Sequence, residues 1–192
     1  MAIEYELKFQ ATPQVQAAIL ETVQGIDQHF SMQTIYYDTP SGQLSARHYT
    51  LRRRMENDIS VCTLKAPADQ GRGEWEVVCL QIEDAIGKLC KLGAPADLPV
   101  LIEEGLIPVC GAKFHRIART VQLESCTVEL ALDQGVLMGG GREISLCEVE
   151  VELKSGSIQQ CNVYAKALAD QFELKPESKS KFRRALALYK GE

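Results

Sequence analysis

Eight separate segments of this 192-residue chain alternate apolar and polar side chains with a period of two. In the first, residues 3–9 (IEYELKF), three charged side chains alternate with four apolar ones. In a β-strand this period puts the two kinds of side chain on opposite faces. The other segments are residues 32–39, 49–55, 59–66, 73–80, 119–125, 127–135 and 145–156. Short Gly, Asp, Asn, Ser and Pro clusters separate most of them, including LDQG at 132–135 and MGGGRE at 138–143, so we predict strands joined by tight turns.

Four further segments have the apolar or charge spacing of helices: residues 12–25, 82–92, 158–172 and 177–190. The first begins with Thr12 and Pro13, which suit the N-cap and the first helical position, and ends at Gly25. No repeat and no Pro- or Ser-rich linker divides the chain. Residues 1–192 are therefore expected to form a single α+β domain.

The helices and the strands compete for the same apolar surface. Each helix must bury an apolar stripe, and the strand faces offer the only large surface for it. We therefore predict a closed eight-stranded antiparallel β-barrel that forms a tunnel, with the helices packed on the outside and the charged strand faces turned inward. Each charged stretch alone is more commonly a solvated strand face; their co-occurrence favours the inward orientation. The inward charged and polar positions are Glu4, Glu6, Lys8, Arg52, Arg54, Thr63, Lys65, Arg72, Glu74, Glu76, Glu129, Asp133, Glu148, Glu150 and Glu152.

The acidic and basic clusters of this inward set lie on different strands, rather than mixing evenly along each strand. Hard divalent cations such as Mg²⁺ or Mn²⁺ bind oxygen ligands and would relieve the repulsion among several carboxylates. Arginine and lysine suit the oxygen atoms of a polyphosphate, because the arginine side chain makes two parallel hydrogen bonds. The pattern therefore predicts a site for a metal-bound chain of phosphates.

Composition excludes several other classes of protein. The formal net charge of −5 argues against a nucleic-acid binder, which usually carries a basic excess. No apolar stretch approaches the length needed to cross a membrane, so no membrane partner is expected. The seven cysteines are scattered without a CxxC pair and no leader pattern precedes them, which predicts reduced thiols in a cytoplasmic protein. The P-loop, HExxH and GxSxG motifs are also absent from the sequence.

The sequence resembles the CYTH superfamily, also called the triphosphate tunnel metalloenzymes. The first strand carries the ExExK pattern, and the resemblance continues through IYYDTPSGQL, LRRR, TLKA, VELALDQG, CEVEVELKSG and SKSKFRRAL. It covers nearly the whole chain and is nearest to bacterial inorganic triphosphatases. It implies a tunnel-shaped antiparallel barrel, a triphosphate substrate and a divalent metal, Mg²⁺ or Mn²⁺.

The resemblance also implies roles for particular residues. The metal ligands would be Glu4, Glu6, Glu150 and Glu152. The residues that hold phosphate oxygens would be Lys8, Arg52, Arg54 and Lys65. The acidic wall positions, available for a second metal or for orienting water, would be Glu74, Glu76 and Asp133. Lys181 matches a lysine that reaches the tunnel from the C-terminal helix, with Lys179 as the alternative.

One part of the resemblance leaves a choice open. The family places basic residues within AKFHRIARTVQ, where Arg116 is the first candidate and Arg119 the second. They are three positions apart, so both face inward only if the strand contains a bulge or begins there.

The function implied is metal-dependent hydrolysis of a triphosphate-containing small molecule, with inorganic triphosphate giving pyrophosphate and phosphate. A class IV adenylate cyclase and a thiamine triphosphatase are the alternatives on the same fold. A non-catalytic module that binds polyphosphate or a nucleotide is the alternative from another class, although anion binding alone does not need the glutamates. A homodimer through an uncovered strand face is compatible with the pattern, but no feature specifies one.

Overall fold

The sheet contains ten strands, all paired in the antiparallel direction. The structure is a computed structural model that describes residues 2–3, 5–68 and 72–192. The strands follow the spatial order β1-β6-β5-β4-β3-β7-β8-β9-β2-β10. Their bounds are β1 (Ala2–Ile3), β2 (Glu6–Gln10), β3 (Gln28–Asp38), β4 (Thr50–Glu56), β5 (Ile59–Pro67), β6 (Arg72–Val78), β7 (Ile107–Gln122), β8 (Cys126–Gly139), β9 (Arg142–Gly156) and β10 (Lys175–Pro176).

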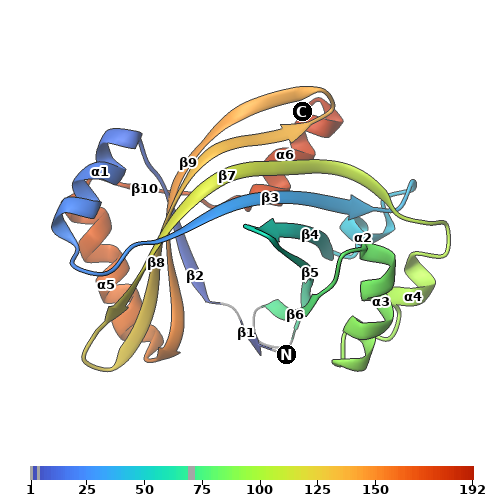
Figure 1. Cartoon of the computed structure of the whole chain (residues 1–192), viewed down its shortest axis with the longest axis horizontal. Helices are drawn as coiled ribbons and strands as arrows, with labels where there is room; N and C mark the ends of the chain where they lie inside the picture. Colours follow the sequence, from blue (N-terminus) through green and yellow to red (C-terminus); the bar gives the residue numbers. More distant parts are fainter. Residues whose placement is uncertain (1, 4, 69–71) are drawn as a thin grey trace.

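The predicted closed eight-stranded barrel is wrong. Within the described residues the sheet has ten strands, and their order runs from β1 to β10 without returning to its start. The expected first strand, residues 3–9, is divided: β1 pairs with β6, whereas β2 pairs with β9 near the other end of the order. In the described part of the chain, the outer edge of β2 carries only the two-residue β10, opposite Phe9 and Gln10. The result is a strongly curved open sheet (Figure 1).

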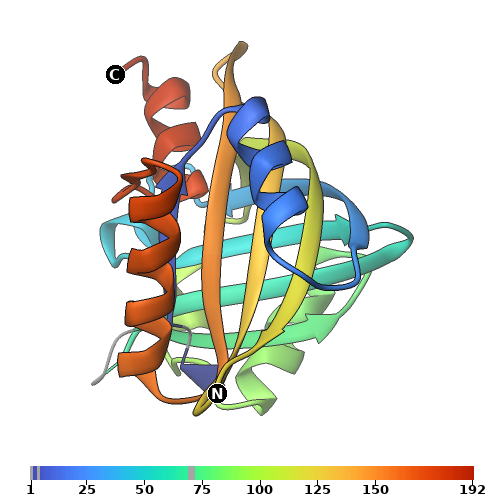
Figure 2. The ribbon, with the colours of Figure 1, turned by 90° about the vertical axis from the view of Figure 1, so that its left-hand side faces the viewer.

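Five helices pack away from the cavity side of the sheet or flank its ends. Their bounds are α1 (Pro13–Thr22), α2 (Gln43–Ala46), α3 (Ile82–Lys91), α4 (Leu98–Leu101) and α5 (Ile158–Gln171). Ile19 of α1 and Leu168 of α5 pack with Val149 and Val151 on the outer face of β9. At the other end, Leu89 of α3 packs with Trp75 and its neighbours. Figure 1 shows these two groups of helices at opposite ends of the sheet, and Figure 2 shows α1 and α5 lying across the outer side of the strands.

The last helix, α6 (Lys181–Lys190), packs on the inner face, so the expectation that all helices lie outside is also wrong. Its Phe182 and Ala185 join a core cluster with Phe114, Leu137 and Leu146. Phe114 lies two residues before Arg116 on β7, so the two side chains share the inner face. The helix is shorter than the predicted 177–190, because it begins after Ser180, whose side chain accepts a hydrogen bond from the Arg183 backbone amide.

Of the two glycine-containing segments LDQG and MGGGRE, both expected to be turns, only the second is a turn. Gly140 and Gly141, both with positive φ, connect β8 to β9 as a two-residue hairpin, which confirms that prediction. The LDQG segment is instead the middle of β8. A Cβ atom at Gly135 would lie 2.1 Å from the Lys113 carbonyl oxygen, so this glycine permits the close approach of β7.

Candidate functional site

The inner face of the sheet encloses a cavity of about 330 Å³. Strands β2 to β9 and the start of α6 all contribute to its wall. Its charged lining residues are Glu6, Lys8, Arg52, Arg54, Glu56, Lys65, Arg72, Glu74, Glu76, Arg116, Glu129, Glu150, Glu152, Lys154 and Lys181. The other lining residues are Phe30, Met32, Tyr36, Thr50, Ser180 and Phe182. The volume and the charge suit a small, highly charged molecule.

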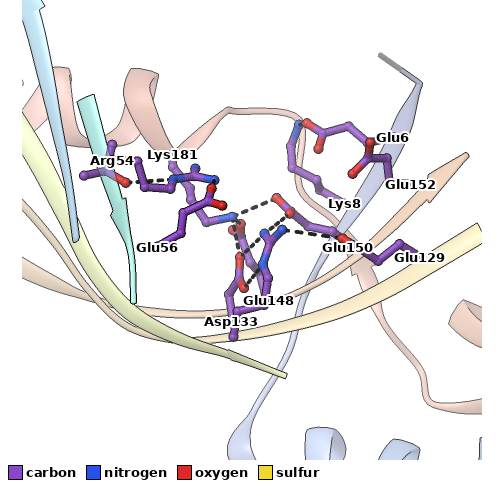
Figure 3. Close-up of polar contacts among 12 residues, drawn as sticks. Glu6, Lys8, Arg54, Glu56, Glu129, Asp133, Glu148, Glu150, Glu152 and Lys181 are labelled. Carbon is purple, nitrogen blue, oxygen red and sulfur yellow. Dashed lines mark hydrogen bonds and ion pairs between the residues drawn. The ribbon is translucent and has the colours of Figure 1, made fainter. Parts of the chain in front are cut away.

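The register of three strands brings three glutamates into one row. Glu152 of β9 is the partner of Glu129 in β8 and of Glu6 in β2. Like charges directly opposite one another destabilise a sheet, so the row needs cations nearby. Lys8 Nζ lies 2.8 Å from a Glu6 oxygen, and Lys154 Nζ lies 3.0 Å from a Glu152 oxygen. Figure 3 shows Glu6, Lys8 and Glu152 together on one side of the site.

A buried ionic cluster adjoins this row, centred on Lys181. The Lys181 ammonium group lies 2.7 Å from Asp133 and 2.7 Å from Glu150, and it also pairs with Glu148 (Figure 3). Oxygen atoms of these three carboxylates all lie within 4.8 Å of one another. One ammonium group therefore holds together three carboxylates that would otherwise repel.

Two arginines complete the buried ionic cluster. Arg116 donates to both Asp133 oxygens at 2.7 Å, and its Nη2 lies 2.5 Å from a Glu150 oxygen. Arg184 pairs with Glu148 from the other side. Asp133 and Glu148 are both 0% exposed, so they lie beneath the cavity wall and not on it. Such bidentate, charge-assisted contacts fix the direction of each side chain.

The pKa values of this cluster follow from burial and pairing. Burial alone would raise the pKa of Glu150, but Lys181 and Arg116 hold it well below its ordinary value. Burial would lower the pKa of Lys181, yet Asp133 and Glu150 raise it above its ordinary value. At Glu148 burial prevails over Lys181 and Arg184, and its pKa is raised. Glu150 and Lys181 are thus a strongly ionised pair at the cavity wall.

The wall formed by β4, β5 and β6 holds four cationic side chains, Arg52, Arg54, Lys65 and Arg72, together with three glutamates. Arg52 Nη2 and Lys65 Nζ lie 3.7 and 3.4 Å from the same Glu74 oxygen. Arg52 Nε is buried and has no hydrogen-bond partner among the described residues. Burial and the neighbouring Arg52 lower the pKa of Arg54 to about 10. A bound anion would offset this unfavourable crowding of cations, so the wall suits an oxyanion.

The structure brings most of the sequence-predicted site residues together at one cavity. Those that line it are Glu6, Lys8, Arg52, Arg54, Lys65, Glu74, Glu76, Arg116, Glu150, Glu152 and Lys181. Asp133 contacts two of them, Arg116 and Lys181, from below. Glu4 lies outside the described residues. Lys179, the alternative to Lys181, is exposed and does not line the cavity.

Arg119 lies elsewhere, on the opposite face of β7. Its Nε lies 2.5 Å from Asp27, and its Nη1 donates to the Leu20 carbonyl oxygen at 2.7 Å and to that of Val23. It thereby ties the end of α1 to the sheet. Of the two candidates for the inward residue, Arg116 lines the cavity and Arg119 does not.

Sequence reasoning gave no role to several residues of the site. Glu129 and Glu148 were expected to face inward, because they share the alternation of Asp133 and Glu150, but neither was assigned a function. Lys154 and Glu56 continue the same alternation, because they lie two positions after Glu152 and Arg54. Arg184 is three positions after Lys181, the spacing that puts two side chains on one helix face, and this is the signal that could have found it.

A second cavity of about 700 Å³ adjoins the first one. Thr50, Arg72 and Phe182 line both cavities. Its other walls come from the segment around α2, from the start of β7 and from α6, and they include Tyr49 and Tyr189. The two cavities thus share one boundary.

The cavity wall formed by β2, β8 and β9 is the acidic wall, which carries Glu6, Glu129, Glu150 and Glu152. It fits a hard divalent cation. Glu6, Glu150 and Glu152 offer carboxylate oxygens, the ligands that Mg²⁺ and Mn²⁺ prefer, and no described histidine or cysteine lines the cavity. The buried trio of Asp133, Glu148 and Glu150 has the spacing of a cation site as well. In that trio the Lys181 ammonium already occupies the place between the carboxylates.

No helix in the described part of the chain is long and apolar enough to cross a bilayer. All seven cysteines are free.

Comparison with known proteins gives consistent results. Residues 2–186 match the family model of the CYTH domain. A protein named inorganic triphosphatase from Haemophilus influenzae is 26% identical over 197 aligned positions, which cover 98% of this chain and 55% of that protein. The chain therefore spans about half the length of this curated relative.

Solved structures show the same fold. A candidate adenylyl cyclase from Hippeastrum with a dominant triphosphatase activity superposes with a TM-score of 0.65 at 16% identity, covering 98% of this chain and 96% of that one. A protein from Pyrococcus horikoshii gives a TM-score of 0.62 at 22% identity over 97% and 99% of the two chains. A candidate adenylate cyclase from Bacillus halodurans gives 0.61 at 20% identity over 95% and 96%.

Proposed function

Because this chain belongs to the CYTH domain family, we propose that it is a metal-dependent hydrolase that cleaves inorganic triphosphate to pyrophosphate and phosphate. The observation that carries the proposal is the separation of charge in the cavity. Glu6, Glu129 and Glu152 form a row on β2, β8 and β9, whereas Arg52, Arg54 and Lys65 lie on β4 and β5. The similarity to a protein named inorganic triphosphatase supports the choice of substrate.

In this proposal the basic residues bind and orient the phosphate chain. Arg52, Arg54 and Lys65 hold it from one wall, and Lys8, Arg116 and Lys181 hold it from the other. Phosphoryl transfer depends mainly on positioning and charge neutralisation, so it needs no nucleophilic side chain. The buried Arg52 Nε atom without a partner among the described residues supports an anion at this wall.

We assign the metal to the acidic wall, with Glu6, Glu150 and Glu152 as ligands in the described part of the chain and Glu4 as a further ligand outside it. Mg²⁺ or Mn²⁺ bound there would neutralise phosphate charge and polarise the phosphoryl group. The row of facing glutamates supports this assignment, because a cation relieves their repulsion.

The acidic residues outside this ligand set, Glu74, Glu76 and Asp133, are assigned to the attacking water. Glu74 and Glu76 line the cavity on β6, and Glu76 also accepts a hydrogen bond from Thr63 at 3.1 Å. Asp133 has a supporting role in this assignment, because its two oxygens are engaged by Arg116 and Lys181. We further propose that residues 1–192 act as one catalytic domain in the cytoplasm, which the seven free thiols support.

The test is phosphate release from inorganic triphosphate, ATP and thiamine triphosphate, with Mg²⁺, with Mn²⁺ and with EDTA. We expect fastest turnover of inorganic triphosphate, and its loss in EDTA and in the variant Arg52→Gln. Phosphate release from none of the three substrates would overturn the hydrolase. Cyclic AMP formed from ATP would identify a cyclase instead, and tight binding without products would identify a binding module.

A further inference from the structure

Two cations on α6 bind the same buried carboxylate. Lys181 pairs with one oxygen of Glu148, and Arg184 pairs with the other. Their spacing of three residues puts both side chains on one face of the helix. Glu148 is 0% exposed, so its charge is stabilised by these partners and not by water.

Only one of the two cations reaches the cavity. Lys181 lines it, and Arg184 does not. The second ion pair of Arg184 is with Glu177, at 3.8 Å, and Glu177 in turn accepts a hydrogen bond from Gln10 on β2. Arg184 therefore fixes the start of α6 against the edge of the acidic wall.

The charges of the buried ionic cluster balance only when Arg184 is included. Three carboxylates, those of Asp133, Glu148 and Glu150, face the three cations Arg116, Lys181 and Arg184. Without Arg184, Glu148 would depend on Lys181 alone. The Lys181 ammonium group would then be drawn toward Glu148 and away from the cavity, because a buried carboxylate without a partner is costly.

We propose that Arg184 is a positioning residue that shares the charge of Glu148 and so leaves the Lys181 ammonium group at the cavity wall to bind triphosphate. Arg184 itself touches no substrate in this arrangement; it acts through Glu148 and Lys181. The proposal rests on the proposed function, in that the cavity must bind a triphosphate.

The test compares Arg184→Gln with Arg183→Gln. Arg183 is the adjacent residue on the same helix, is exposed, and has no side-chain ion-pair or hydrogen-bond partner recorded among the described residues, so the two variants change net charge equally. The first measurement is the dissociation constant of inorganic triphosphate by calorimetry in EDTA, which is independent of metal and turnover. The second is KM and kcat with Mg²⁺, and the third is the thermal midpoint of unfolding.

For Arg184→Gln we expect triphosphate binding to weaken about tenfold and KM to rise in proportion, with kcat within about twofold of wild type. Arg183→Gln should retain the wild-type dissociation constant. Arg184→Lys should restore binding to within about threefold, because it keeps the charge beside Glu148 but loses the fork geometry. If Arg184→Gln does not fold, Arg184→Met, which keeps the apolar stem and removes the charge, replaces it with the same expected result.

An unchanged dissociation constant in Arg184→Gln, with only a lower thermal midpoint, would overturn the proposal and leave Arg184 a purely structural residue. Equal weakening in Arg183→Gln would overturn it as well, since the effect would then be one of net charge. If the wild type binds triphosphate without releasing phosphate, the proposed hydrolysis fails while the binding comparison still decides the role of Arg184. Absence of binding by the wild type in EDTA, together with no measurable turnover in Mg²⁺, would overturn both.

Discussion

Glu6 and Glu152 lie directly opposite each other on neighbouring antiparallel strands, and each is paired with a lysine two residues further along its own strand. Lys8 serves Glu6, and Lys154 serves Glu152. Burial alone would lower the pKa of Lys8, but Glu6 raises it above its ordinary value, so the lysine stays charged. The two carboxylates are thus held face to face beside charged lysines, an arrangement that suits a divalent cation.

Replacing Glu6 by glutamine should therefore weaken metal-dependent activity more than it destabilises the fold. We expect Glu6→Gln to lower kcat/KM for inorganic triphosphate by about 100-fold and to raise the Mg²⁺ concentration needed for half-maximal activity. Titration of activity with Mg²⁺ measures both effects. Glu124→Gln, at an exposed glutamate outside the cavity, is the matched control and should match wild type. Equal Mg²⁺ requirements in Glu6→Gln and wild type would remove Glu6 from the ligand set.

Chelation should abolish activity without unfolding the protein. The buried carboxylates are already neutralised by Arg116, Lys181 and Arg184, so the fold does not need a metal to offset their repulsion. We expect EDTA to lower the thermal midpoint of unfolding by no more than about 2 °C, which corresponds to less than about 1 kcal/mol. Differential scanning calorimetry with and without EDTA tests this. A large drop in EDTA would show that metal binding and folding are coupled.

The alternation of side chains predicted which way most strands face, but not how they pair. Lys8 and Arg52 line the cavity, whereas Phe9 and Leu51 lie in outer cores, as a period of two requires. Closure of the barrel was predicted wrongly, because a period of two indicates which face a side chain lies on but not which strands pair. Most of β7 was missed, because the predicted strand began at residue 119. Residues 109–112 are buried on both faces, so no alternation marks the first part of the strand.

The site was predictable to the extent that it depends on strand faces. Glu6 and Glu152 needed only their phase along each strand, although the register that makes them partners came from the fold. The sequence alone could not distinguish Arg116 from Arg119. On either side of this segment the alternation of side chains is not clear enough to show which of the two faces inward. The spacing of three residues places Arg184 on the same helix face as Lys181, but only the docking of α6 on the inner face shows that this helix face meets Glu148.

The two arginines of β7 should respond differently to substitution. Arg116→Gln removes a cavity cation and leaves Asp133 and Glu150 with Lys181 alone, so kcat/KM should fall by at least about tenfold. Arg119→Gln removes contacts to Asp27 and to the end of α1, and should cost about 1–3 kcal/mol of unfolding free energy. Its activity per folded molecule should stay at the wild-type level. Urea unfolding and kinetics on the same preparations separate the two effects, and a loss of catalysis in folded Arg119→Gln would contradict the assignment.

Stability should decline at alkaline pH because of buried thiols. Burial raises the pKa of Cys62 to about 11 from an ordinary value of 9.0. The unfolded thiol therefore ionises first, so the contribution of Cys62 is complete below about pH 9 and is lost as the pH rises toward 11. The loss should reach about 1–2 kcal/mol. Urea midpoints measured across this range, for wild type and for Cys62→Ala, test the effect. The variant should show the smaller decline, and identical pH dependence would exclude Cys62 as a cause.

Two glycines provide a test of the fold itself. A Cβ atom at Gly135 would lie 2.1 Å from the Lys113 carbonyl oxygen and 2.5 Å from Phe114 Cα, both backbone atoms that cannot move aside without shifting β7. Gly135→Ala should therefore cost about 2–4 kcal/mol of unfolding free energy.

Gly87 is the matched control, since it lies within α3 and a Cβ atom there meets nothing within 4 Å. Gly87→Ala should raise stability by about 0.5–1 kcal/mol through helix propensity alone. Because β7 carries Arg116, the shift caused by Gly135→Ala should also raise KM for inorganic triphosphate in the folded fraction. A Gly135→Ala protein with wild-type stability and KM would mean that β7 and β8 do not approach as closely at this point as the structure places them.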